Sequence, residues 1–92
     1  MLKKSVSIIG FGHFGEVLYR LLKDDFQVTI FRRHPITDWA SPNTSTKIAT
    51  SLEEAMESEI IFFCTPIETF GQVIHDCKKY FRSDQLLIDV LS

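Results

Sequence analysis

Hydrophobic residues along this chain fall into two patterns, short continuous runs and longer segments with helical spacing. Continuous runs rich in β-branched and aromatic residues occur at Val6–Ile9, Gln27–Phe31, Ile60–Cys64 and Leu86–Val90. Each run predicts a strand, and the run Ile60–Cys64 predicts one that is buried on both faces, as the strands of parallel sheets are. Residues 47–49 predict a weaker strand, and the segment 34–46, rich in Pro, Ser, Thr and Asn, is expected to be a loop.

The segments between these runs carry apolar residues on one helical face. A helix is expected from about Phe14 to Lys23 and another from about Thr69 to Phe81. Ser51 and Glu54 predict a short helix ending near Glu57, through a capping box in which the Glu54 carboxylate reaches back to the Ser51 amide. The apolar stripe of the first helix consists of Phe14, Val17, Leu18, Leu21 and Leu22. Strands that alternate with helices predict right-handed crossovers and a parallel sheet, which together make an α/β fold.

The first predicted strand ends in a glycine-rich turn that also opens the first helix. Its sequence, Gly10-Phe11-Gly12-His13-Phe14-Gly15, has the G-x-G-x-x-G spacing of dinucleotide-binding turns, in the strand–turn–helix context that gives this spacing its meaning. Gly10 allows the tight turn, Gly12 lets a pyrophosphate approach the backbone, and Gly15 lets the helix pack closely on the strand. The free amides and positive dipole end of the helix favour an anion there. We therefore predict a doubly wound, mostly parallel Rossmann-like sheet of about five strands; the alternative is a tight turn that binds nothing.

The other residues of this turn are candidate cofactor contacts. Phe11 lies between the first two glycines. His13 either contacts phosphate or ribose or is a solvent-facing residue at a variable position. Phe14 is interpreted first as a core residue of the helix and second as a cofactor contact.

The end of the second strand predicts which dinucleotide binds. NAD-binding domains of this type carry an acidic residue about 20 positions past the first glycine, where it holds the ribose hydroxyls. Here that region reads Phe31-Arg32-Arg33-His34, and the next acid is Asp38. A guanidinium binds a 2′-phosphate that a carboxylate would repel. The sequence therefore favours NADP over NAD, with Arg32 as the first candidate and Arg33 as the second; the alternative is a solvated basic loop.

The fourth and fifth strands end in further candidates. Cys64, Thr65 and Pro66 are expected beside the nicotinamide ribose, because parallel sheets bind ligands at the carboxyl ends of their strands. Pro66 has the alternative role of ending the strand. Asp89 interrupts an apolar run, and a structural hydrogen bond is expected of it in preference to acid–base chemistry.

Composition narrows the function classes. Ten Lys and Arg stand against twelve Asp and Glu, so no overall basic field favours nucleic acid. Six of the ten fall within residues 1–34, against three acids, which leaves room for a local anion site. No apolar run is long enough to span a membrane. Cys64 and Cys77 match no metal spacing and are expected to be reduced thiols, which points to a cytoplasmic protein without a metal.

Four segments together resemble one enzyme family. They are Ile9–Gly15, Ser51–Ala55, Phe62–Ile67 and Ile88–Ser92, and they are similar to the N-terminal part of prephenate and arogenate dehydrogenases. The resemblance extends over nearly the whole chain, and its most specific part is the closing Asp89-Val90-Leu91-Ser92. It implies that Ser92 lies at the active site, where it orients a catalytic His and contacts substrate.

The same resemblance implies the reaction. A hydride passes from a cyclohexadienol to the nicotinamide and the ring carboxylate leaves as carbon dioxide, which yields an aromatic ring in tyrosine biosynthesis. Residues 1–92 are then the NAD(P)-binding domain, and the helical domain for substrate binding and dimerisation is expected outside them. On this view the 92 residues bind NADP without turnover.

Two other functions stay open. One is a different NADP-dependent enzyme, such as a hydroxyacid dehydrogenase or an imine reductase. The other is a module that binds a dinucleotide and does no chemistry. The exposed last strand is also a ready pairing edge, so a homodimer is expected to be possible.

Overall fold

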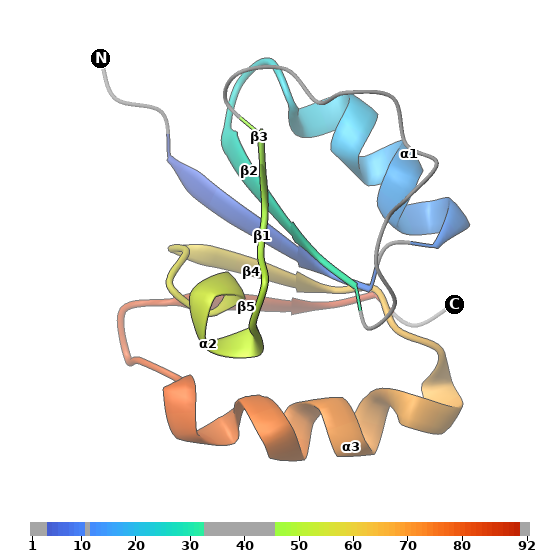
Figure 1. Ribbon diagram of the computed structural model, residues 1–92, viewed down its shortest axis with the longest axis vertical. Coiled ribbons are helices and arrows are strands. Elements are labelled where there is room, and N and C mark those ends of the chain that lie inside the picture. Colours follow the sequence, from blue (N-terminus) through green and yellow to red (C-terminus); the bar gives the residue numbers. More distant parts are fainter. Residues whose placement is uncertain (1–3, 11, 33–45, 91–92) are drawn as a thin grey trace.

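A parallel sheet of five strands forms the centre of the molecule. The computed structural model describes residues 4–10, 12–32 and 46–90. The strands are β1 (Ser5–Ile9), β2 (Gln27–Phe31), β3 (Thr46–Ile48), β4 (Ile60–Phe63) and β5 (Leu86–Asp89). Their order across the sheet is β3-β2-β1-β4-β5 (Figure 1). The prediction of an α/β fold with a parallel, Rossmann-like sheet is confirmed.

All strands end at one edge of this sheet. Ile9 is in register with Phe31 on one side and with Phe63 on the other, and Phe63 is in register with Asp89. From β1 the chain continues to one side of the sheet, where β2 and then β3 lie, whereas β4 and β5 follow on the other side of β1. The strand order therefore reverses between β1 and β4, and open α/β sheets bind ligands at the carboxyl ends of such a pair.

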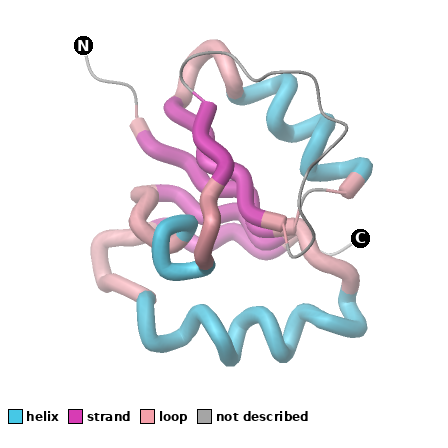
Figure 2. Tube along the Cα trace, viewed as in Figure 1, coloured by secondary structure: helices cyan, strands magenta, loops and turns pink. Residues whose placement is uncertain are grey.

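Helices cover both faces of the sheet. They are α1 (His13–Leu22), α2 (Leu52–Ala55) and α3 (Ile67–Cys77), and a 3₁₀ turn (Lys78–Tyr80) extends α3. α1 lies on one face, and α2 and α3 lie on the other (Figures 1 and 2). This division follows from the right-handed crossovers, since the connections on the two sides of β1 run in opposite directions.

The core has one cluster of buried side chains on each face. On the α2–α3 face, Ile61 and Phe63 are buried with Met56 and Cys77. Phe63 makes edge-to-face contacts with Phe70 and Phe81, with ring centroids 6.3 and 6.4 Å apart. The cluster on the α1 face contains Ile8, Val28, Ile30 and Tyr19.

The α1 stripe is only partly buried, contrary to the sequence prediction. Phe14, Val17 and Leu21 are 44%, 42% and 70% exposed, whereas Gly15 and Tyr19 are buried. Gly15 lies close to the backbone of the glycine turn, and the helix face that carries Gly15 and Tyr19 is the one turned toward the sheet. The interpretation of Phe14 as a core residue is therefore wrong.

Other departures from the predicted elements are small. α3 begins at Ile67, two residues before the predicted start, because Pro66 ends the extended segment as the N-cap residue with φ −59°. β3 covers residues 46–48 instead of 47–49. In the capping box the Ser51 hydroxyl accepts from the Glu54 amide at 3.2 Å, as predicted. The Glu54 carboxylate, however, accepts from the amide of Thr50 at 2.9 Å and not from that of Ser51.

Asp89 also differs from its prediction. Its side chain is exposed at the end of β5, so it needs no buried partner. In the part of the chain that the structure describes, no helix is long and apolar enough to cross a membrane. Over the same ranges, no three His, Cys, Asp or Glu side chains gather into a group that would hold a metal ion.

Candidate functional site

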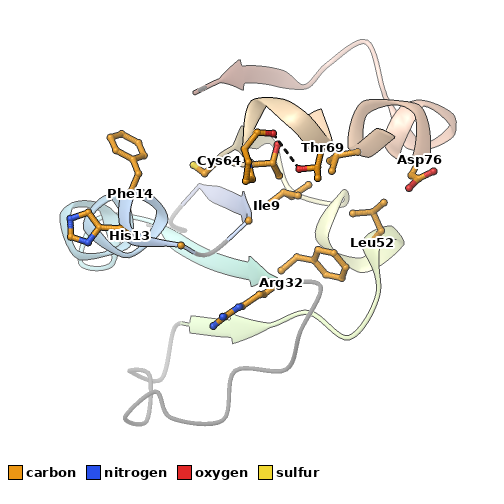
Figure 3. Close-up of a pocket in the computed structure, with 14 residues that line it drawn as sticks. Ile9, His13, Phe14, Arg32, Leu52, Cys64, Thr69 and Asp76 are labelled. Atoms are coloured by element: carbon orange, nitrogen blue, oxygen red, sulfur yellow. Dashed lines mark hydrogen bonds between the residues drawn. The ribbon is translucent and has the colours of Figure 1, made fainter. Parts of the chain in front are cut away.

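A cleft of about 960 Å³ opens at the carboxyl edge of the sheet, where the strand order reverses. Its walls come from the glycine turn, the end of β2, the segment after β4, and the helices α2 and α3. Figure 3 shows His13 and Phe14 at one end of the cleft and Leu52 and Asp76 at the opposite end. Pockets that bind small molecules typically measure about 300–1,000 Å³, so the cleft has room for a large ligand.

The three glycines of the turn have different environments. Gly10 has φ +96°, and a Cβ at this position would lie 2.7 Å from the carbonyl oxygen of Cys64. A Cβ at Gly15 would lie 2.7 Å from the carbonyl oxygen of Gly10. Gly12 faces open space, because a Cβ there would meet no atom within 4 Å. Gly10 and Gly15 thus have the packing roles that the sequence predicted, and Gly12 leaves the backbone open to a ligand.

The first turn of α1 begins directly at this open position. Gly12 is the N-cap residue, and among the residues that the structure describes no side chain caps the helix. Uncapped amides at a helix N-terminus attract anions through their partial positive charge. Glu16 is the acidic residue of this turn, and Arg20 pairs with its carboxylate at 2.7 Å. The pair offsets the charge of the Glu16 carboxylate near the start of the helix.

Arg32 forms the β2 side of the cleft. It is exposed and directly follows β2, next to Phe31, whose carbonyl accepts a hydrogen bond from the Gly10 amide at 2.9 Å. This bond fixes the end of β2 against the glycine turn. A cation therefore lies on the same rim as the amides of α1, as the sequence predicted.

The segment after β4 supplies a hydroxyl without a partner. Thr65 is 6% exposed, and its Oγ1 has no hydrogen-bond partner among the described residues. A buried hydroxyl without a partner is costly, and a ligand in the cleft is one source of the missing bond. Beside it, burial raises the pKa of the Cys64 thiol from 9.0 to about 11, so this cysteine adds no negative charge near neutral pH.

Most of the predicted site residues meet in this one cleft. Those that line it are Gly10, Gly12, His13, Phe14, Arg32, Cys64, Thr65 and Pro66. Gly15 does not line the cleft and packs behind the turn. Phe11, Arg33 and Ser92 lie outside the described residues, and their assignments stay predictions.

The opposite end of the cleft was not predicted from the sequence. It is lined by Phe31, Leu52, Thr69, Val73 and Asp76. The signal was present in α3, where positions 69, 73 and 76 are spaced four and three apart and so share a helix face. Periodicity alone does not reveal that Val73 lines a cleft, because an apolar residue beside a ligand site has the same spacing as one beside the core.

Comparison with known proteins agrees with this geometry. Residues 5–92 match the family described as NADP oxidoreductase, coenzyme F420-dependent. This chain belongs to that family, and its fold is that of the NAD(P)-binding domains of oxidoreductases. No curated protein matches the chain.

Several solved structures share the fold. A pyrroline carboxylate reductase from Plasmodium falciparum with NADP bound is 20% identical with a TM-score of 0.77, over 99% of this chain and 34% of its own. A prephenate dehydrogenase from A. aeolicus with NAD⁺ is 18% identical with a TM-score of 0.79, over 100% of this chain and 35% of its own. An imine reductase from Myxococcus stipitatus with NADP⁺ is 20% identical with a TM-score of 0.80, over 96% and 32%. The chain thus spans about a third of the length of these proteins.

The residues present fit a dinucleotide. The open space at Gly12 accommodates a group that packs directly on the backbone, and the uncapped amides match a diphosphate. The hydroxyl of Thr65 lacks a partner that such a ligand would provide. The cleft is also lined both by Arg32 after β2 and by Cys64, Thr65 and Pro66 after β4, so it offers separate contacts for the two halves of such a ligand.

Proposed function

We propose that this domain binds NADP along the carboxyl edge of the sheet and serves an NADP-dependent dehydrogenase or reductase. The observation that carries the proposal is the glycine turn, where an open backbone position and uncapped helix amides face a cleft that also holds a cation. When bound in this way, the nicotinamide exchanges a hydride with a substrate. The rest of the proposal concerns what the residues of this chain do.

The pyrophosphate rests on the amides at the start of α1, where the dipole stabilises its charge. Gly12 permits this contact, because any side chain there would enter the space that the phosphates need. Thr65 donates its hydroxyl to the ligand, and the neutral thiol of Cys64 lies alongside without repelling it. His13 and Phe14 stand at the mouth of the cleft at the α1 end.

Arg32 selects the phosphorylated cofactor. The adenosine ribose of dinucleotides lies at the end of β2 in folds of this type, and this chain has a guanidinium there in place of an acid. A hydrogen bond between charged groups contributes about 1.5–3 kcal/mol. Because Arg32 is exposed and solvent screens its charge, its contribution to NADP binding is at most of this size. We expect a preference for NADP over NAD of roughly tenfold. Arg33 is the second candidate for this role.

Calorimetry with NADP and NAD tests the proposal. The wild-type protein should bind NADP more tightly, and Arg32→Ala should bring the two affinities together by weakening NADP alone. Lys4→Ala is the matched control, because it removes one positive charge at the opposite edge of the sheet. Equal affinities in the wild type would refute the selection of NADP, and the absence of binding at millimolar concentration would refute the site.

For the substrate, we propose prephenate or arogenate. The support is the resemblance of the chain to that family, above all in Asp89-Val90-Leu91-Ser92, with Ser92 in contact with substrate. The fold of the A. aeolicus prephenate dehydrogenase is compatible with this proposal, although reductases share the same fold. Reduction of NADP by the full-length gene product in the presence of each cyclohexadienol is the test. No reduction with either compound would contradict it.

A second candidate follows from the family description. Members are described as F420-dependent, so the hydride partner of NADP is then a deazaflavin coenzyme in place of a cyclohexadienol. The same assay with reduced F420 and NADP distinguishes the two candidates. Absorbance changes of both coenzymes, without a cyclohexadienol, would favour this alternative.

A further inference from the structure

The two faces of β4 are covered very differently. Ile61 and Phe63, on the face of α2 and α3, are 0% and 2% exposed, whereas Ile60 and Phe62, on the face of α1, are only partly buried. On the α1 face of the neighbouring β5, Leu86 is 56% exposed. In the described part of the chain, no helix lies over β4 and β5 on this face (Figures 1 and 2). An apolar area of the sheet is therefore left open beside α1.

The strand register defines this open area. Ile8 packs with Tyr19 of α1, and it is in register with Phe62, which is in register with Ile88. Residues in register on neighbouring parallel strands point to the same face of the sheet, and alternate residues along a strand do so as well. The area, called the floor below, consists of Ile60, Phe62, Leu86 and Ile88. It carries no charged side chain.

α1 forms a wall along the floor. Its residues Phe14, Val17 and Leu21 lie three and four positions apart, so they share one side of the helix, and they are 44%, 42% and 70% exposed. Tyr19, two positions from both Val17 and Leu21, lies on another side and hydrogen-bonds across to β3 at 2.9 Å. The exposed side is thus turned away from β3. Figure 3 shows Phe14 on the side of α1 nearer Cys64, the residue that follows β4.

We propose that this face is the interface between two copies of the chain, in which α1 of each copy lies on the floor of the other. α1 stands about 10 Å above the sheet over β1 and β2, and the floor lies lower over β4 and β5, so each copy carries a ridge and a recess. A two-fold axis parallel to the strands places each ridge over the other recess and gives a closed, isologous dimer. This interface goes beyond the proposed function and does not depend on it.

The charges on α1 are compatible with contact with an apolar floor. Arg20 pairs with Glu16 at 2.7 Å, and Lys23 at the end of the helix pairs with Asp24 at 3.4 Å. A lone charge would be costly to bring onto an apolar surface, whereas a paired charge is partly compensated. α1 therefore brings no net charge onto the floor of the second copy.

The available area corresponds to a reversible dimer. Specific interfaces typically bury about 10% of the surface of a small protein, which is about 600 Å² of the 6116 Å² exposed here. α1 has ten residues and is about 15 Å long and 10 Å wide, and the floor beside it has similar dimensions. Together they present roughly 15 by 20 Å to the second copy. This is at the low end for specific dimers, so we expect a Kd on the order of 10 µM.

Analytical ultracentrifugation of the 92-residue protein tests the interface. The wild type should be mainly dimeric at roughly 100 µM, and Leu21→Asp, at an exposed position of α1, should be monomeric. Ile67→Asp is the matched control. Ile67 is 62% exposed but begins α3, on the other face of the sheet, so this variant should stay dimeric. Circular dichroism should show the same secondary structure in all three proteins.

Mixing two variants tests the predicted contact directly. The axis keeps the strand direction, so the end of α1 near Leu21 meets the beginning of β5, where Leu86 lies. Leu86→Lys alone should be monomeric. An equimolar mixture with Leu21→Asp should associate at least about tenfold more tightly than either variant alone, because the new opposite charges meet in one contact and the other contact is wild type. A mixture of Leu21→Asp with Ile67→Lys should stay monomeric.

Three outcomes would refute the interface. A wild type that is monomeric at roughly 100 µM would leave this face to a different polypeptide or to a further segment. A dimer that survives Leu21→Asp would point to the free edge of β5 instead. Failure of the oppositely charged variants to associate on mixing would show that α1 and the floor do not meet.

Discussion

The two ends of the cleft present opposite kinds of surface. At the glycine turn the absence of side chains matters, because Gly12 faces open space and the helix amides are left uncapped. At the opposite end the side chains themselves matter, because Phe31, Leu52 and Val73 form apolar walls and Asp76 carries a carboxylate. Substitutions at the first end therefore act through added volume, and those at the second act through lost contacts.

The two ends also differ in whether their residues are needed for the stability of the fold, for ligand binding, or for both. A Cβ at Gly10 or Gly15 would collide with neighbouring backbone, so these two glycines are required by the fold, whereas a Cβ at Gly12 would meet no atom within 4 Å, so the fold does not require glycine there. Phe31, Leu52 and Val73 serve both purposes, since they pack on the core and also line the cleft. The predictions below test this separation, from the largest expected effect to the smallest.

Gly10→Ala should destabilise the fold itself. The added Cβ would lie 2.7 Å from the Cys64 carbonyl oxygen at a residue with φ +96°. Backbone strain of this kind costs about 1–3 kcal/mol, and the contact with the carbonyl adds to it. Chemical denaturation should show a loss of about 3 kcal/mol or more. A loss below the error of the measurement would contradict the turn geometry.

Gly12→Val should abolish binding while the fold is retained. Its side chain would enter the open space above the turn, so we expect the affinity for NADP to fall by about 100-fold. Stability should change by less than about 1 kcal/mol, the usual effect of an N-cap substitution. Calorimetry and denaturation on the same sample measure both. Gly71→Val is a control for the added volume, because Gly71 also faces open space but does not line the cleft.

Thr65→Val should stabilise the free protein and weaken the complex. The exchange keeps the shape of the side chain but removes a buried hydroxyl that has no partner among the described residues. Relief of that penalty is expected to raise the unfolding free energy by about 1 kcal/mol, and the lost ligand bond to weaken NADP binding by a similar amount. Opposite shifts in the two quantities are the signature. A variant that is less stable and binds normally would show that the hydroxyl is satisfied within the protein.

Ionisation of the two cysteine thiols should have a smaller effect, a dependence of the unfolding free energy on pH. Burial raises the pKa of Cys64 and of Cys77 from 9.0 to about 11, so the folded state holds these protons longer than the unfolded state does. Their contribution is therefore fully present below pH 9 and is lost as the pH rises toward about 11. Unfolding free energies between pH 8 and 11 should fall less steeply in Cys64→Ala than in the wild type. Equal slopes would mean that the Cys64 thiol is not buried.

The sequence predicted the fold well because each strand and its turn carry a local signal. Continuous apolar runs gave the strands, and the glycine spacing gave the turn between β1 and α1. The exposure of Phe14 was missed, because helical periodicity does not reveal how closely Gly15 allows α1 to approach the sheet. That approach is a tertiary contact between residues on two elements.

The candidate site was predicted at one end only. Residues of the glycine turn, Arg32 and the segment after β4 have sequence signals, since they follow strands that end at one edge. Leu52 and Asp76 reach the cleft only through the packing of α2 and α3 against the sheet. Ser7 shows the same limit, because its buried hydroxyl bonds to the Ala55 carbonyl and to Ser58 Oγ, contacts across about fifty positions of sequence.

The central claim is that a diphosphate rests on the open backbone at the start of α1. The most direct measurement is an amide-resolved NMR titration of the 92-residue protein with NADP. The largest shifts should fall on the amides of Gly12 and His13, followed by those of Arg32 and Thr65. Shifts confined to the opposite edge, around Lys4 and Gln27, or none at all at millimolar NADP, would contradict it.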